Sequence, residues 1–123
     1  MRKLIASEYE ECKAFFEWSQ TQPILKECLI KVCNEGIRTP AQAMHLRAIG
    51  MRPGVPDYLL PLANNKYNSL WLEMKRSDKV KQRHDPRQYD WVLRLANLGN
   101  YATFCYGWEN AAAIVTAYLA NQL

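Results

Sequence analysis

The sequence lacks several features that would each place it in a different class of protein. It has no apolar run approaching the roughly 18–20 residues of a membrane-spanning helix, so we expect no membrane attachment. It has no long low-complexity tract, and 49% of its 123 residues are hydrophobic, which indicates a folded chain with one modest core. Its N-terminal residues lack the apolar stretch of a signal peptide, so we expect a cytoplasmic protein.

Paired metal-binding cysteines are also missing. The four cysteines form no CxxC pair, and no paired histidines accompany them: Cys12, Cys28, Cys33 and Cys105. A structural zinc site is therefore not expected. We expect free thiols in a reduced compartment, buried as small hydrophobic side chains.

Charge is modest overall but concentrated in one segment. The formal net charge is +4, which permits a polyanionic partner without requiring one. Basic side chains gather in residues 75–87, namely Lys75, Arg76, Lys79, Lys81, Arg83, His84 and Arg87. This segment is either an ordinary solvated loop or a stripe that contacts phosphates, and we favour the stripe.

Two carboxylates lie in short apolar segments. Asp57 begins the segment at 57–62 and Glu73 lies in the segment at 70–75, and both segments are typical of buried strands. A buried carboxylate is costly unless a cation or strong donors neutralise it. Residues 63–69 form a polar run rich in turn formers between the segments, which predicts a hairpin.

The hairpin would bring a lysine to the same place. Side chains alternate across a strand, so Glu73 and Lys75 share one face while Met74 points to the other. If Asp57 lies on that face of the neighbouring strand, the three charged side chains converge. Two carboxylates suit Mg²⁺, and a metal-bound water can attack a phosphodiester. The plainer interpretation is a surface salt bridge between Glu73 and Lys75, and the spacing alone leaves both open.

The residues around this pattern resemble a known family. Gly54-Val55-Pro56-Asp57 and Leu72-Glu73-Met74-Lys75-Arg76 are similar to the core motif of the PD-(D/E)XK nucleases. Further segments in matching order resemble the virus-type replication-repair nuclease (VRR-NUC) domain: residues 34–38, residues 48–57, Gln88 with Trp91, and Gly107 with Trp108. The resemblance runs from about Ser7 to Leu119, almost the whole chain.

The resemblance implies a DNA endonuclease that uses Mg²⁺ or Mn²⁺. The residues that would carry the reaction are Glu8, Asp57, Glu73, Lys75 and Gln88. Those that would hold the metal are Glu8, Asp57, Glu73 and the carbonyl of Met74. Those that would contact DNA are Arg38, Arg52, Arg76, Lys79, Lys81 and Arg83.

The acid on the first helix has two candidates. Glu8 lies ten residues before Trp18, which resembles the family spacing best. Glu11 is about one turn further along and shares roughly the same face of the helix. We therefore favour Glu8 and keep Glu11 as the alternative.

The resemblance also implies a substrate and partners. Stand-alone domains of this kind resemble homodimeric, structure-selective nucleases, so branched DNA such as a Holliday junction is the expected substrate, in a bacterial or phage-infected cell. The alternatives are a flap-type nuclease, a catalytically silent DNA-binding module, and a subunit targeted by a helicase or another repair partner. Asp57, Glu73 and Lys75 together argue against a silent module.

Turn and capping residues divide the chain into one α/β unit with no visible linker, so we expect residues 1–123 to form a single domain. The expected helices are 8–20, 41–48, one opened by Asp85-Pro86 and ended by Gly99, and 109–119. The expected strands are 29–33, 57–62, 70–75 and 101–106. The order is α-β-α-β-β-α-β-α. The predicted fold is restriction-endonuclease-like, a mixed central sheet flanked by helices.

Overall fold

The computed structural model describes residues 4–33 and 39–123, and in this part of the chain five helices and four strands form. In chain order they are α1 (Glu8–Ser19), α2 (Pro23–Cys28), β1 (Ile30–Lys31), α3 (Pro40–Ala48), β2 (Tyr58–Leu60), β3 (Leu70–Lys75), α4 (Pro86–Asn97), β4 (Tyr101–Tyr106) and α5 (Trp108–Leu119).

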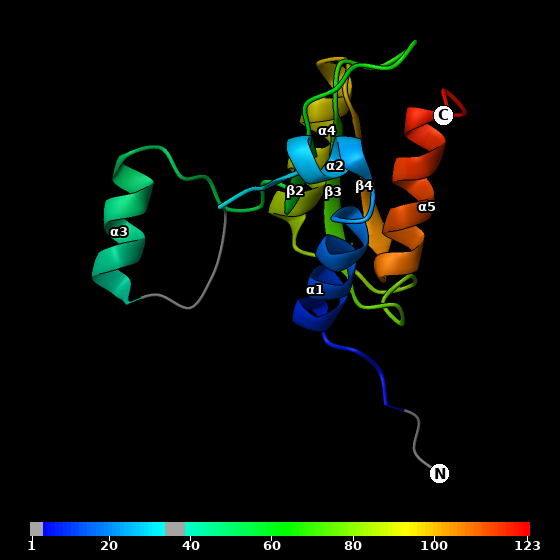
Figure 1. The fold of residues 1–123 in the computed structure, drawn as a ribbon. Coiled ribbons are helices and arrows are strands. Elements are labelled where there is room, and N and C mark those ends of the chain that lie inside the picture. Colours follow the sequence, from blue (N-terminus) through cyan, green and yellow to red (C-terminus); the bar gives the residue numbers. More distant parts are fainter. Residues whose placement is uncertain (1–3, 34–38) are drawn as a thin grey trace.

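The strands form one mixed sheet in the order β1-β2-β3-β4. β2 pairs antiparallel with both β1 and β3, whereas β4 pairs parallel with β3. α1 and α5 pack on one face of this sheet and α4 on the other (Figure 1). The predicted fold class, a mixed sheet flanked by helices, is confirmed.

The element order differs from the predicted one by a helix after α1. Pro23 is expected only to follow the first helix, but it occupies the first position of α2, where a missing N–H costs nothing. Leu25 anchors this short helix in the core with only 1% of its surface exposed. The strand expected at 29–33 is reduced to Ile30–Lys31 as a result. A helix of six residues is too short for the 3.6-residue hydrophobic period to be recognised in the sequence.

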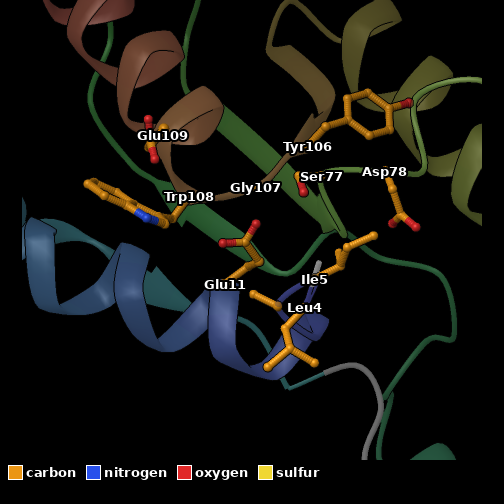
Figure 2. Close-up of a pocket in the computed structure, with 10 residues that line it drawn as sticks. Leu4, Ile5, Glu11, Ser77, Asp78, Tyr106, Gly107, Trp108 and Glu109 are labelled. Carbon is orange, nitrogen blue, oxygen red and sulfur yellow. The ribbon is translucent and has the colours of Figure 1, made fainter. Parts of the chain in front are cut away.

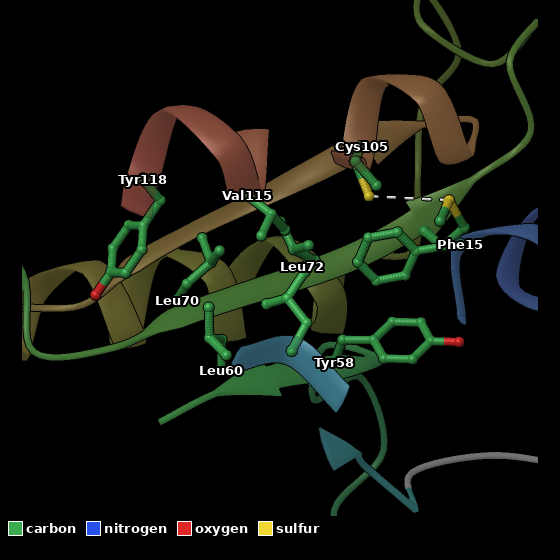
Figure 3. Close-up of a cluster of buried hydrophobic side chains, with 11 residues drawn as sticks. Phe15, Tyr58, Leu60, Leu70, Leu72, Cys105, Val115 and Tyr118 are labelled. Carbon is green, nitrogen blue, oxygen red and sulfur yellow. Dashed lines mark hydrogen bonds between the residues drawn. The ribbon is translucent and has the colours of Figure 1, made fainter. Parts of the chain in front are cut away.

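Alternation along β3 separates the core from the opposite face of the sheet. Leu70, Leu72 and Met74 are each at most 1% exposed and pack with Phe15 of α1 and Val115 of α5 (Figure 3). The intervening residues of β3 point toward α4 instead. One strand therefore supplies both the centre of the core and the charged side chains described below.

α3 stands apart from the rest of the molecule (Figure 1). Thr39 caps its first turn, but none of its nine residues is buried. Met44 and the following Ile49 are 64% and 83% exposed. Helices shorter than about 12–15 residues are marginal in water without packing. Among the described residues, α3 therefore has little of the buried packing that normally stabilises so short a helix.

The segment before Asp57 is held against the start of α4. Gly54 has a φ of +86°, and a Cβ at this position would lie 2.9 Å from three atoms of Arg87. Only a glycine permits this approach, because a side chain would collide with the backbone of α4. The contact fixes Asp57 relative to the first turn of α4, where Gln88 lies.

This close approach can be tested with two glycines that share a positive φ. Gly54→Ala introduces both backbone strain and a collision, whereas Gly50→Ala introduces strain alone, because a Cβ there meets no atom within 4 Å. We expect Gly50→Ala to lower the free energy of unfolding by about 1–2 kcal/mol, and Gly54→Ala to lower it by about 1–3 kcal/mol more. Urea denaturation measures both, and equal losses would contradict the packing of Gly54 against α4.

Candidate active site

Asp57 lies where β2 and β3 stop pairing. The last paired residues of the hairpin at this end are Tyr58 and Leu72. One residue beyond, Oδ2 of Asp57 accepts a hydrogen bond of 2.8 Å from the amide of Met74. The Asp57 carbonyl accepts a bond of 2.8 Å from the amide of Val32. The Asp57 carboxylate therefore takes the place that a backbone carbonyl of β2 would have in the hydrogen bonding between β2 and β3. This bond fixes the carboxylate beside Met74.

Glu73 and Lys75 share one face of β3, as the alternation predicts. Nζ of Lys75 lies 4.0 Å from Oε1 of Glu73, and their side chains are only 11% and 5% exposed. The same ammonium donates a bond of 2.7 Å to Oε1 of Gln88 on α4. This pair is therefore not a surface salt bridge, and Gln88 is a buried part of the site rather than a residue of the helix surface.

A second lysine lies at Asp57, and the sequence pattern does not reveal it. Nζ of Lys31 is 3.6 Å from Oδ1 of Asp57 and donates a bond of 3.0 Å to the carbonyl of Val32. Lys31 reaches this place because β1 pairs with β2 in a register that sets it opposite Tyr58. A two-residue edge strand carries no detectable pattern, so only the sheet order exposes this contact.

The acids surround a buried thiol in the core. Burial raises the pKa of Cys105 well above its ordinary value, and the negative charges of Asp57, Glu73 and Glu11 raise it further. Burial also raises the pKa of the Cys12 thiol to about 11, with Asp57 as the next cause. Such protonated thiols are poor nucleophiles and metal ligands.

All four cysteines are free, as expected. The expectation that they are buried holds for Cys105 and is wrong for Cys33, which is exposed. Cys33 lies two residues past Lys31, the last residue of β1 that pairs with β2.

The two candidate acids of α1 occupy different environments. Glu8 is exposed in the first turn of α1, and its negative charge is one of the smaller causes that raise the pKa of Cys12. Glu11 is only 7% exposed and points toward Gly107 at the start of α5 (Figure 2). Gly107 has a φ of +88°, which favours glycine, and a Cβ there would lie 2.6 Å from Oε2 of Glu11, so a larger residue would also push the Glu11 side chain away. Glu11 also lines a pocket of about 560 Å³ with Ser77.

The basic segment after β3 is partly neutralised by its own acids. Arg76 pairs with Asp78 at 2.8 Å, and Arg87 pairs with Asp85 at 2.8 Å. The remaining cations have no acidic partner within 4.0 Å among the described residues, and they are Lys79, Lys81 and Arg83. Arg52 is exposed in the segment before Asp57. Arg38 lies outside the described residues.

Aromatic rings enclose His84 beside Lys75. The imidazole stacks on Phe104 and Tyr89 with ring centroids 4.8 Å and 5.8 Å away, and its Nε2 lies 3.1 Å from the hydroxyl of Tyr106. Burial, with the nearby ammonium of Lys75, lowers the pKa of His84 below its ordinary value of 6.5. The neutral imidazole is therefore favoured at neutral pH. The sequence pattern gives no signal for this cluster.

The carboxylates present fit a hard divalent cation. No group of three or more His, Cys, Asp or Glu side chains forms a metal site in residues 4–33 and 39–123. Asp57 and Glu73 are both carboxylates beside Met74, with side chains that are 20% and 5% exposed, and Asp57 is fixed there by the Met74 amide. Mg²⁺ commonly uses one or two protein carboxylates and keeps several waters, so this pair matches its requirements.

These features are a mixed four-stranded sheet flanked by helices, with acidic side chains and a lysine gathered where β2 and β3 stop pairing. A solved structure described as a "VRR_NUC domain protein" matches with a TM-score of 0.81 at 20% identity, over 95% of this chain and 91% of that chain. The chain therefore has the VRR_NUC fold, as its motifs predict. No family model and no curated protein sequence matches the chain. Among the described residues no helix has the length and apolarity to cross a membrane.

The environment of His84 gives a test of the site geometry that is independent of activity. Its pKa, measured by NMR titration of the imidazole, should lie below 6.5, and Lys75→Met should raise it because a neighbouring positive charge is removed. Because the folded state favours the neutral ring, its contribution to stability is present above pH 6.5 and is lost as the pH falls. Lys66→Met, in the distant hairpin loop, should leave the pKa unchanged. A His84 pKa at or above 6.5 would contradict the described packing.

Proposed function

We propose that the protein is a metal-dependent DNA endonuclease. The observation that carries this proposal is a pair of contacts where β2 and β3 stop pairing: Asp57 accepts a hydrogen bond from the Met74 amide, and the flanking residues Glu73 and Lys75 form an ion pair. The likeness to a VRR_NUC domain protein over most of both chains supports a nuclease-type domain. Buried charges at this density are costly for a fold that does not use them.

Asp57 and Glu73 would hold Mg²⁺ or Mn²⁺, with the carbonyl of Met74 and an acid of α1, Glu8 by family spacing, as further ligands. When bound, such an ion polarises the phosphate and lowers the pKa of a coordinated water. The 2.8 Å bond from the Met74 amide fixes the carboxylate of Asp57 beside β3, next to the residue that follows Glu73.

Lys75 and Gln88 act as a pair in this proposal. The ammonium of Lys75 is nearly buried and is positioned by its 2.7 Å bond to Gln88. A fixed positive charge in a partly desolvated site stabilises the negative charge that develops on the phosphate in the transition state. Gln88 is then a positioning residue, because the structure places its amide oxygen on Lys75.

Contacts to DNA would go mainly to phosphates. The proposed contacts are Arg38, Arg52, Arg76, Lys79, Lys81 and Arg83. Most of the described members are exposed and follow the site along one segment, which suits the backbone of a nucleic acid rather than its base edges. Selection would then rest on DNA shape, and we propose a branched substrate such as a Holliday junction.

α3 supports a homodimer as the working form. None of its nine residues is buried among the described residues, and Met44 and the following Ile49 are exposed, so a second copy would supply packing for this helix. A two-fold dimer also places two active sites on two strands of a branched DNA. A helicase or another repair protein is the alternative partner for the same helix.

Cleavage of matched substrates tests the proposed function. The wild type with Mg²⁺ should cut a four-way junction faster than a linear duplex of the same sequence. Asp57→Asn should lower the single-turnover rate by at least on the order of 100-fold, because the site loses a charge on which the reaction depends. Its DNA affinity in Ca²⁺ should be kept or increased, because a negative charge near phosphate is removed.

Asp90→Asn, on the exposed surface of α4, is the matched control and should leave the rate unchanged. Tight binding without cutting by the wild type would favour the silent module over the enzyme. Faster cutting of flaps than of four-way junctions would redirect the substrate assignment to a flap-type nuclease. Normal cleavage by Asp57→Asn would remove Asp57 from the site.

A further inference from the structure

One face of α1 exposes aromatic rings that the fold does not use. Tyr9, Lys13 and Phe16 follow each other at i, i+4 and i+7, so they form a single stripe along the helix. Tyr9 is 74% exposed and Phe16 is 48% exposed, whereas the neighbouring Phe15 is fully buried in the core. The stripe is therefore a surface separate from the packing of α1 on the sheet.

This stripe forms one wall of a groove of about 380 Å³. The described residues that line it are Tyr9, Cys12, Lys13, Phe16, Lys31 and Tyr58. Three of them are aromatic, two carry an ammonium, and none carries a carboxylate. Nζ of Lys31 lies 5.7 Å from the centroid of the Tyr58 ring, so at least one cation lies beside an aromatic ring in the groove.

The groove ends at the candidate active site. Lys31 lines the groove, and its Nζ lies 3.6 Å from Oδ1 of Asp57. Tyr58, which also lines the groove, directly follows Asp57 in the chain. A chain of phosphates along Lys13 and Lys31 would therefore arrive at the carboxylate that the proposed reaction requires.

We propose that this groove binds an unpaired DNA strand and leads it to the scissile phosphate. The inference rests on the proposed endonuclease function and assigns it a second binding site. Grooves for single strands combine lysines along the backbone with aromatic rings on which bases stack. A duplex hides the faces of its bases, so exposed rings favour unpaired nucleotides, as occur at a branch point or flap. The two lysines, with no carboxylate among the lining residues, favour an anionic occupant.

Binding without a metal tests the groove separately from catalysis. Fluorescence anisotropy in EDTA would measure the affinity for an oligo-dT strand and for a linear duplex. Tyr9→Leu and Phe16→Leu keep an apolar side chain but remove the ring, and each should weaken oligo-dT binding by about 5-fold to 100-fold. Duplex affinity should change by less than about twofold in both variants, because duplex bases offer no face for stacking.

Lys13→Met should lower the salt dependence of oligo-dT binding by about 0.7 per lost phosphate contact. The matched control is Lys66→Met in the hairpin loop, which should behave as the wild type. A 2-aminopurine base in the unpaired strand of a flap should lose fluorescence on binding, and Tyr9→Leu should restore it. These results together would support a stacked, unpaired strand in the groove.

Other outcomes would overturn the proposal. Unchanged oligo-dT affinity in both ring variants, or no oligo-dT binding by the wild type, would remove the groove from DNA recognition. A change of oligomeric state in light scattering, without a change in oligo-dT affinity, would make it a protein interface. If the wild type cleaves branched DNA but the ring variants bind oligo-dT as the wild type does, the proposed role of the groove is refuted and the proposed endonuclease function is not. Groove-dependent binding without any cleavage refutes the enzyme alone.

Discussion

The hydrogen bond from the Met74 amide to Asp57 is the interaction on which the site depends. It joins the end of β2 to β3 where their backbone pairing stops, at 2.8 Å, and thereby holds a carboxylate beside Glu73 and Lys75. Close packing of Gly54 against α4 fixes the segment that carries this carboxylate. The short segment from Gly54 to Asp57 therefore contacts both α4 and β3, and it positions the Asp57 carboxylate beside β3.

Charge burial gives this arrangement its chemical character. The whole Glu73 residue is only 3% exposed, and the ammonium of Lys75 is bonded to Gln88. Bulk water therefore solvates these two charges poorly. Lys31 supplies a second cation on the other side of Asp57. Acids and ammoniums that alternate in a partly desolvated site can bind a divalent ion and a phosphate together, which surface charges screened by solvent do poorly.

The sequence predicts the parts of the site that depend on local rules. Period-two alternation places Glu73 and Lys75 on one face, and capping residues such as Ser7 locate the helix starts correctly. It does not predict α2 or Lys31, because six-residue helices and two-residue strands carry too little pattern. Nor does spacing distinguish Glu8 from Glu11, since their difference in burial arises from the distant turn at Gly107.

Metal binding by the protein alone tests the central claim most directly. Calorimetric titration of metal-free protein with Mn²⁺ should show a specific site, and Glu73→Gln should weaken it by at least about tenfold, because a removed ligand costs at least as much as a removed supporting residue. Glu17→Gln, on the exposed side of α1, should bind as the wild type does. Equal Mn²⁺ affinity in the wild type and Glu73→Gln would contradict a metal held between Asp57 and Glu73.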